Sequence, residues 1–162
     1  MDKGDAERFD GWISVHLGVL ARIARTFASG ADQHDLMQEL MLAVWRAAPS
    51  FRGDAKETTF MFRVAHNAAL TWRRRERTRQ RRHEEYERLV VPESTGRDGV
   101  VVSRLYDAIR QLDTLDRSLV LLSLEGVNYA QIAEIHGLSE TNVGARLTRA
   151  RKKLARLMEV SQ

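Results

Sequence analysis

The side chains best suited to chemistry in this sequence are a group of polar and basic residues near the C-terminus. Between residues 139 and 154, apolar residues recur at helical spacing and predict an amphipathic helix. They are Val143, Leu147, Ala150 and Leu154. The opposite face is small and polar at first and basic later, which suits a DNA major groove, where early turns meet base edges and later turns meet phosphates. This face holds Thr141, Asn142, Ala145, Thr148, Arg149 and Lys152, and Arg146 and Lys153 flank it.

A shorter helix precedes this one and would hold it in place. Its apolar side is formed by Tyr129, Ile132 and Ala133. Gly137 suits a left-handed turn, and Ser139 suits the cap of the following helix because its hydroxyl can accept from a backbone N–H one turn on. The small Ala133 allows a close crossing, so residues 129–154 predict a helix-turn-helix. An ordinary amphipathic helix with a solvated basic face is the alternative for this stretch.

A second basic group lies in the middle of the chain, in a helix expected from near Thr59 to Arg82. Residues 73–82 hold seven arginines and one glutamate. Aromatic residues at the start of a helix and arginines at its end suit a single-stranded nucleic-acid surface, where rings stack on bases and cations hold phosphates. A solvated helix end is the alternative. The predicted inner face is Met61, Ala65, Ala68 and Trp72, and the outer face is Arg63, His66, Asn67, Leu70 and Arg74.

Acidic and amide side chains form a third group, on a helix predicted over residues 33–48. Its apolar stripe is Leu36, Leu40 and Val44. Asp32 is placed to cap the start of this helix. Asp35, Gln38, Glu39 and Arg46 form a separate polar stripe. No second set of ligands and no paired-histidine motif accompanies these carboxylates, so neither a metal site nor a cofactor is predicted.

Charge alternates in blocks along the chain, although the total is only +4. Residues 1–62 carry −2, residues 63–88 carry +5, residues 89–138 carry −3 and residues 139–162 carry +4. Basic blocks on helices predict phosphate-binding surfaces. DNA would repel the acidic blocks, which are therefore expected to face a protein.

Composition excludes several classes of protein. Cysteine is absent, so neither disulfides nor thiolate metal sites can form. No apolar run is long enough to span a membrane and the polar N-terminus lacks signal-peptide features, so a cytoplasmic protein without membrane insertion is expected. Only eight residues follow Leu154, so no further C-terminal domain is expected. A phosphate-binding loop, a nucleophile elbow and a clear acid pair are all missing, so no enzyme is predicted.

The chain is expected to be all-α, with two small helical domains joined by a flexible linker and the helix-turn-helix in the second. The N-terminal domain is predicted over residues 1–82 and begins with a helix over residues 5–28. Proline and glycine among Glu, Ser and Thr place the linker at residues 83–103. The C-terminal domain is predicted over residues 104–162. Two helices, over residues 105–112 and 116–125, would support its helix-turn-helix.

Three segments together resemble one known family. They are DLMQELMLAVWRA (residues 35–47), SFRGDAKETTFMFRVAHNAALTWRRR (50–75) and LEGVNYAQIAEIHGLSETNVGARLTRARKKL (124–154). The first is similar to an acidic helix, the second to a promoter-melting loop and helix, and the third to a promoter-binding helix-turn-helix. In this order and spacing they resemble the small extracytoplasmic-function (ECF) sigma factors of the sigma-70 class over nearly the whole chain.

The resemblance implies a transcription initiation factor that leaves the chemistry to RNA polymerase. The N-terminal domain would dock on core polymerase through Asp35, Gln38 and Glu39. It would also open the minus-ten element, holding a flipped base in the loop at residues 50–58 and contacting DNA through Arg63, Asn67 and Arg74. The C-terminal domain would bind the duplex minus-thirty-five element. Its contacts would be Asn142, Ala145, Arg146, Arg149 and Lys153. An anti-sigma factor or another regulator is a further expected partner.

Three features depart from the family pattern. Phe60 stands where tryptophan is common, which keeps an aromatic platform. His66 stands where arginine is usual, so a phosphate contact is not expected there. Gly144 and Ala145 replace larger polar residues, so fewer base contacts and more dependence on DNA shape are expected.

Three other classes of protein are weighed against this interpretation. A helix-turn-helix regulator that does not act as a sigma factor shares the C-terminal motif, but it does not explain the helix of Asn67 or the acidic stripe. A nucleic-acid enzyme lacks candidate catalytic groups. A structural helical adaptor leaves the two basic blocks unexplained. Co-purification of core polymerase subunits separates a sigma factor from all three.

Overall fold

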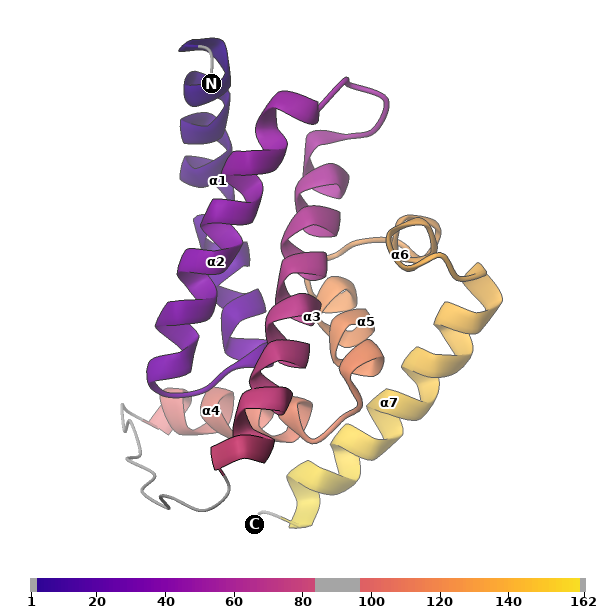
Figure 1. Cartoon of the computed structure of the whole chain (residues 1–162). Coiled ribbons are helices and arrows are strands. Elements are labelled where there is room, and N and C mark those ends of the chain that lie inside the picture. Colours follow the sequence, from indigo (N-terminus) through magenta and orange to yellow (C-terminus); the bar gives the residue numbers. More distant parts are fainter. Residues whose placement is uncertain (1–2, 84–96, 161–162) are drawn as a thin grey trace. The chain divides into compact units, whose positions relative to one another are not determined.

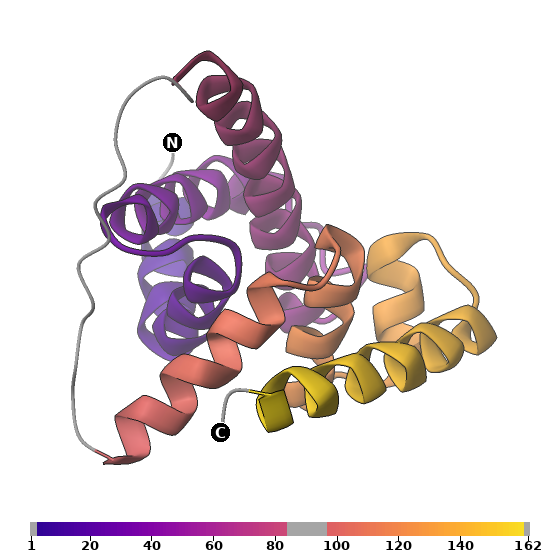
Figure 2. The same cartoon turned by 90° about the horizontal axis from the view of Figure 1, so that it is seen from below.

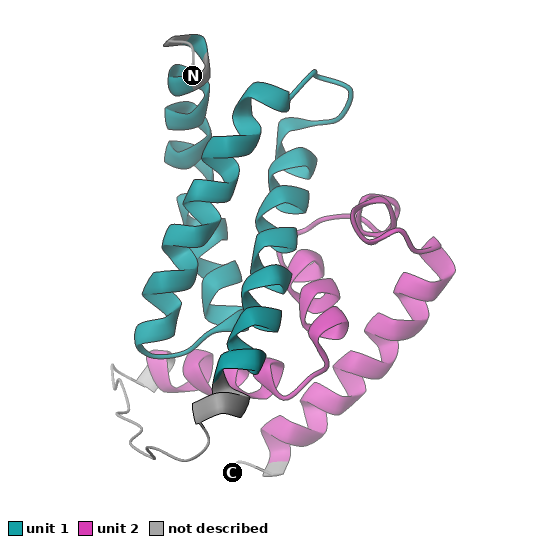
Figure 3. Ribbon diagram, in the orientation of Figure 1, with its two compact units in different colours: residues 1–85 teal, residues 86–162 magenta. Residues whose placement is uncertain are grey.

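The computed structural model describes residues 3–83 and 97–160 and contains seven α-helices and one short 3-10 helix in those ranges. These residues form no strand, which confirms the all-α prediction. The chain divides into two compact units, residues 1–85 and residues 86–162, which Figure 3 shows in different colours. None of the helices in the described ranges has both the length and the apolar character needed to cross a membrane.

Unit 1 is built from three helices that alternate in direction (Figure 1). They are α1 (Lys3–Phe27), α2 (Ala31–Ala47) and α3 (Glu57–His83), with the 3-10 turn η1 (Ala48–Ser50) after α2. Pro49 lies in that turn, and because it has no N–H it cannot continue the α-helical hydrogen bonding. The core joins one stripe from each helix. These stripes are Leu20, Ile23 and Phe27, then Leu36, Leu40 and Val44, then Met61, Phe62 and Ala65.

The start of α2 corrects the prediction that Asp32 caps it. The cap residue is Gly30, at a φ of 57°, and no side chain caps the helix there. Glycine tolerates this left-handed conformation, which suits the reversal between α1 and α2. Asp32 lies inside the first turn, where its charge still interacts favourably with the helix dipole.

The inner face of α3 also differs from the prediction. The sequence pattern places His66 on the outer side, but it is only 4% exposed and its ring centroid lies 5.8 Å from that of Phe27. Ala69 is completely buried, whereas Ala68 is half-buried. The arginine-rich end of the helix also buries Glu76. Packing against α1 and α2 therefore rotates the buried stripe by about one residue, and His66 faces the core.

Unit 2 is built from four helices. They are α4 (Arg97–Arg110), α5 (Thr114–Leu124), α6 (Tyr129–His136) and α7 (Glu140–Val160). α7 packs against the other three, and Figure 2 shows it as the long helix with α6 near its N-terminal end. Its buried residues are Val143, Leu147, Ala150 and Leu154, which confirms the predicted apolar face.

Local hydrogen bonds delimit the two helices of the helix-turn-helix. Asn128 and Gln131 form a reciprocal capping box at the start of α6. Gly137 ends α6 at a φ of 65°. The hydroxyl of Ser139 accepts from the amide of Asn142 at 3.2 Å and so caps α7. The predicted roles of Gly137 and Ser139 are both confirmed.

The helix α4 begins inside the predicted linker. That linker spans residues 83–103, but the chain is already helical from Arg97. Val100, Val101 and Val102 lie in the early turns of α4 and are exposed. The part of the predicted linker from residue 84 to residue 96 lies outside the described residues.

Candidate nucleic-acid and polymerase interfaces

The helix α7 presents an exposed polar face as the sequence predicts. Asn142, Ala145 and Arg149 lie on this face and are all exposed. Thr148 is exposed as well, and its hydroxyl donates to the carbonyl of Gly144 at 2.9 Å. The small, exposed side chain of Ala145 lets a groove approach the backbone of α7 closely, whereas Gly144 is half-buried and a Cβ there would lie 3.4 Å from the ring of Tyr129 on α6. Arg149 is the long donor on this face nearest to those turns.

Arg146 lies on the flank of that face and contacts two carboxylates of α5. Its Nε donates to Asp116 Oδ1 at 2.8 Å, and its Nη2 lies 3.4 Å from Asp113 Oδ2. Only 25% of the Arg146 side chain is exposed, and only 19% of the Asp116 side chain. This arginine, which the sequence pattern groups with the DNA contacts, thus has its charge matched inside unit 2.

The two carboxylates that hold Arg146 differ in their protonation behaviour. Burial by itself raises the pKa of Asp113. Hydrogen bonds from the backbone and side chain of Asp116 and the charge of Arg146 outweigh burial, so the pKa of Asp113 is lowered. Burial, followed by the charge of Asp113, raises the pKa of Asp116, although Arg146 opposes this. One guanidinium therefore serves two neighbouring acids, and Asp113 holds its negative charge more firmly.

The other flanking cation, Lys153, is exposed and its Nζ donates to the carbonyl of Gln111 at 3.4 Å. Arg151 donates to the hydroxyl of Ser123 at 2.8 Å. Both contacts tie basic side chains of α7 to the rest of unit 2 while leaving them exposed. They remain accessible to phosphate, which weakly held surface cations can bind.

The predicted DNA contacts of unit 1 lie along one stripe of α3. Asn67 and Arg74 are exposed, and Arg63 is half-buried. Their positions differ by four and seven residues, so they project from nearly the same side of the helix. The structure therefore brings Arg63, Asn67 and Arg74 to one face, while the neighbouring His66 is buried.

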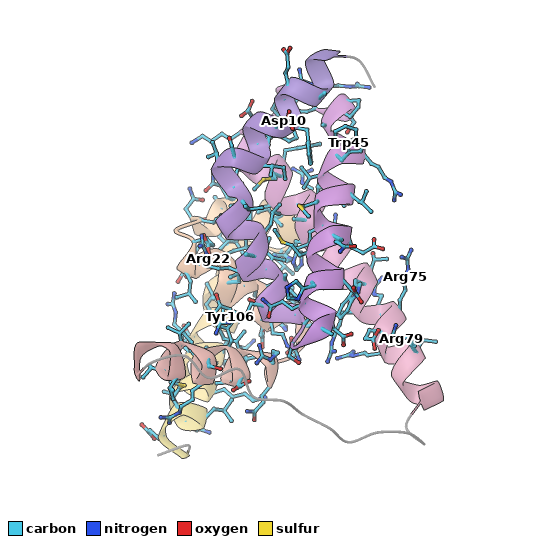
Figure 4. The ribbon with its side chains drawn as sticks, turned by 90° about the vertical axis from the view of Figure 1, so that its left-hand side faces the viewer. Asp10, Arg22, Trp45, Arg75, Arg79 and Tyr106 are labelled. Carbon is cyan, nitrogen blue, oxygen red and sulfur yellow. The ribbon has the colours of Figure 1, made fainter. Side chains whose placement is uncertain are left out.

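The arginines at the end of α3 have different surroundings. Arg79 Nε lies 3.3 Å from Glu76 Oε2, and its Nη2 lies 3.9 Å from Asp32 Oδ1 on α2. Burial, followed by the charge of Arg77, lowers the pKa of Arg73. Figure 4 shows Arg75 and Arg79 projecting from this part of α3, and both are exposed. Glu76 thus anchors the arginine-rich segment, whose outer side chains still offer positive charge.

The loop between η1 and α3 is supported by three aromatic rings. Phe51 and Phe60 flank the loop, with ring centroids 5.2 Å apart. Trp12 of α1 lies 5.4 Å from Phe51 and 5.8 Å from Phe60. Trp12 is buried and the two phenylalanines are half-buried. The predicted platform residue Phe60 is therefore part of a cluster that fixes both ends of the loop.

The polar stripe of α2 is exposed along its whole length. Asp35, Gln38 and Glu39 all face solvent. Leu42 continues the stripe one turn further and is 46% exposed, and Trp45 nearby is 38% exposed and packs edge-on against Phe9. Sequence reasoning missed Leu42, although its spacing of three and seven residues from Glu39 and Asp35 was the available signal. An exposed stripe that mixes acidic and large apolar residues suits a protein partner.

Together these surfaces fit one class of protein, the helical transcription factors, because unit 2 has a helix-turn-helix with an exposed polar face and unit 1 has an exposed acidic stripe on α2 and a separate exposed polar and basic stripe on α3. Comparison with known proteins gives the family. Residues 12–79 match the family model "Sigma-70 region 2", and residues 103–154 match "Sigma-70, region 4".

Named relatives agree with these matches. The chain is 31% identical over 157 residues to the ECF RNA polymerase sigma factor SigM of Mycobacterium tuberculosis, which covers 96% of this chain and 79% of that protein. It is 28% identical over 173 residues to the RNA polymerase sigma factor NccH of Alcaligenes xylosoxydans xylosoxydans, which covers 99% of this chain and 91% of that protein. The chain belongs to the ECF sigma factors of the sigma-70 family. It is an alternative sigma factor that directs transcription initiation, and sigma factors are initiation factors rather than enzymes.

Two solved structures share the fold. One is the sigma factor RpoE from Bartonella quintana in complex with the anti-sigma factor NepR, with a TM-score of 0.76 and 21% identity over 96% of this chain and 99% of that chain. The other is CnrH in complex with the cytosolic domain of CnrY, with a TM-score of 0.71 and 24% identity over 97% of this chain and 91% of that chain. At these identities the likeness supports the fold alone.

Proposed function

We propose that this chain docks on core RNA polymerase through the outer stripe of α2. Asp35, Gln38 and Glu39 supply polar and acidic contacts, and Leu42 adds an apolar one about one turn beyond Glu39. The supporting observation is that these side chains are exposed on a helix whose opposite side is fully buried. Apolar contact excludes water, and acidic groups select a basic partner surface.

In the same complex, unit 1 opens the minus-ten element. Arg63, Asn67 and Arg74 face the separated strand from α3, and the loop before α3 receives a flipped base. The aromatic cluster under that loop holds its two ends together. Unstacking a base costs free energy, and binding of the flipped base must offset that cost. A loop that is already fixed offsets it better, because the loop does not have to be ordered as well.

Unit 2 binds the duplex minus-thirty-five element with the exposed face of α7. Asn142 and Ala145 lie over base edges, Arg149 is the principal base-reading candidate, and Lys153 holds phosphate. The observation that carries the proposal is the exposed polar face of α7 with its capped N-terminus directly after the tight turn at Gly137. Helix-turn-helix proteins insert that end of the second helix into the major groove.

Such a protein acts where RNA polymerase acts, in the cytoplasm, and an anti-sigma factor is a fitting regulator. This last point extends to the present chain what is seen for RpoE, which forms a complex with the anti-sigma factor NepR.

The decisive experiment is run-off transcription with purified core RNA polymerase on a library of promoter-length duplexes. The full chain is expected to select a set of related templates, and core polymerase without it to select none. Co-purification of core subunits with the chain gives an independent check. A chain that binds duplex DNA but neither retains core polymerase nor supports run-off products would be a helix-turn-helix regulator instead.

A further inference from the structure

The surroundings of Arg146 on the flank of α7 do not have the electrostatic character of a DNA-binding site. Arg146 brings one positive charge, whereas Asp113 and Asp116 beside it bring two negative charges when both are ionised. A phosphate approaching this edge meets a cluster that is negative overall, which repels it. Among the described side chains of residues 3–83 and 97–160, no carboxylate lies within ion-pair distance of the exposed Arg149.

Releasing Arg146 to DNA would also leave its present partners in an unfavourable state. The Asp116 side chain is only 19% exposed and receives the short, 2.8 Å hydrogen bond from Arg146. Removing one member of a half-buried, hydrogen-bonded ion pair leaves the other charge less well solvated than it is in water. The energetic balance therefore keeps Arg146 on α5.

The carboxylates that receive Arg146 are themselves held in place. Asp113 is the N-cap of α5, and its side chain accepts from the amide of Asp116 at 2.9 Å. Arg117 is buried and donates from Nε to the carbonyl of Leu112 at 2.9 Å and from Nη2 to the carbonyl of Arg110. The junction between α4 and α5 is thus built around Arg117, and its two carboxylates are fixed acceptors for a side chain from α7.

A second contact joins the same flank of α7 to the same junction. Lys153 follows Arg146 by seven residues, so both lie on one side of the helix. The Nζ of Lys153 donates to Gln111, which directly precedes Leu112 in that junction. Contacts two turns apart restrain the rotation of α7 about its own axis better than either contact alone.

We infer that Arg146 is a positioning residue, which holds α7 on the α4–α5 junction through Asp113 and Asp116 so that Asn142, Ala145 and Arg149 face the DNA, and that it does not contact DNA itself. The inference rests on the proposed binding of duplex DNA by α7. It changes the assignment of one predicted contact, and it makes the acidic pair part of the promoter-reading apparatus.

The test uses the full chain bound to core RNA polymerase. The probe is a library of promoter duplexes randomised over the upstream element, and the sequence that the wild-type chain enriches is then compared with a scrambled one across a salt series. Arg146→Ala is expected to weaken binding to the enriched duplex more than to the scrambled one, because the base-facing side chains lose their alignment, and to leave the salt dependence unchanged. Arg149→Ala is the matched control, since it removes the same charge from the same helix without disturbing the α4–α5 junction, so its effect should not depend on substitutions at Asp113 and Asp116.

A charge exchange gives the sharper result. Arg146→Glu alone should weaken promoter binding, whereas Arg146→Glu combined with Asp116→Arg should recover most of it because the pair is restored with its signs reversed. If Arg146 reads DNA, a glutamate at that position prevents binding whatever stands at position 116. Failure of the exchanged, folded chain to regain binding would overturn the inference.

A second pair of variants keeps the test valid if the exchanged chain does not fold. Asp113→Asn with Asp116→Asn removes both charges, and asparagine remains a good N-cap. This variant should match Arg146→Ala in its loss of binding, and adding Arg146→Ala to it should cause little further loss, because coupled residues are non-additive. A salt dependence that is steeper by about one charge in the asparagine variant would show that Arg146 is released to phosphate and would overturn the inference. So would an Arg146→Ala salt dependence that is shallower by about one charge.

The same experiment separates this inference from the proposed function. If the wild-type holoenzyme enriches no sequence, the proposed function fails and the inference fails with it. If the wild type enriches a sequence and only the Arg146 variants behave otherwise than expected, the positioning role alone is wrong.

Discussion

The acidic side chains of the two units differ in whether they face solvent or a basic side chain of the same unit. On α2 of unit 1, Asp35 and Glu39 are exposed. On the α4–α5 junction of unit 2, Asp113 and Asp116 hold an arginine of α7. The sequence pattern assigns both acidic blocks to a protein partner, but part of the second block binds this chain's own basic helix. The sign of a charge block therefore does not tell which molecule it faces, because a partner within the fold can neutralise it first.

Basic side chains follow the same division. Arg79 in unit 1 contacts Glu76 and Asp32 but remains 63% exposed, whereas Arg146 in unit 2 is 25% exposed. An exposed pair exchanges with solvent ions and contributes little to stability, so Arg79 is still available to phosphate. A half-buried pair is screened much less. The burial of the pair, rather than the presence of an acid nearby, decides whether an arginine is available to DNA.

The largest expected effect tests the exposed acids of unit 1. Asp35→Arg combined with Glu39→Arg should abolish retention of core RNA polymerase, because two reversed charges oppose a basic partner surface. Helicity should survive, since both side chains are exposed. The measurement is a pull-down of core subunits with the full chain, together with circular dichroism.

The matched control for this variant reverses two exposed acids on another helix of the same unit. Glu7→Arg with Asp10→Arg on α1 makes the same change in charge. Figure 4 shows Asp10 on that helix. Equal retention of polymerase by the two double variants would remove the docking role from α2.

The next effect concerns the exposed basic face of unit 2. Arg149→Ala should reduce the preference for the enriched upstream element over a scrambled one by about 1–3 kcal/mol, the usual value of a good bidentate base contact. Lys153→Ala should weaken both duplexes nearly equally and make the salt dependence shallower by about one charge. Holoenzyme binding across a salt series measures both. An unchanged ratio for Arg149→Ala would make this residue a backbone contact and leave specificity to Asn142 or to DNA shape.

The third expected effect is a loss of stability of unit 2 in acid. Burial lowers the pKa of His136 from 6.5 to about 4, and its Nε2 lies 3.0 Å from the hydroxyl of Ser118. Above pH 6.5 the ring is neutral in both folded and unfolded chains, so its contribution is fully present. As the pH falls from 6.5 toward 4, the unfolded chain takes up a proton that the folded chain does not, and stability is lost.

After allowance for partial exposure, this loss should be about 1 kcal/mol by pH 5. The check is thermal unfolding of the full chain at pH 7.5 and pH 5 with His136→Gln as the comparison. That variant keeps a hydrogen-bonding group for Ser118 and removes the titration, so its transition should shift less between the two pH values. An equal shift in both proteins would show that other groups control the acid response.

The smallest expected effect distinguishes opening from binding. Asn67→Ala should reduce transcription from a duplex promoter by the equivalent of about 1 kcal/mol of free energy, the typical net value of one hydrogen bond. The reduction should be smaller on a template already opened by a mismatch bubble. The reason is that Asn67 is exposed on the α3 stripe that would face the separated strand. Similar losses on both templates would indicate a role in affinity rather than in opening.

The helix-turn-helix was predictable because its determinants are local. The left-handed Gly137, the Ser139 cap and the buried stripe of α7 each depend on neighbours within about four residues, which is the range that capping and helical periodicity cover. The exposed stripe of α2 was predictable for the same reason. A helix with one apolar side must turn its other side to solvent or to a partner.

Only the tertiary structure decided the positions at the edges of those faces. His66 lies next to the predicted inner side of α3, and the packing of Phe27 turned it inward. Arg146 lies at the edge of the polar face of α7, and the α4–α5 junction, about thirty residues earlier in the chain, supplied its partners. A step of 100° per residue defines the centre of a helical face well and its edges poorly, because an edge residue faces whichever neighbour the crossing angle brings to it.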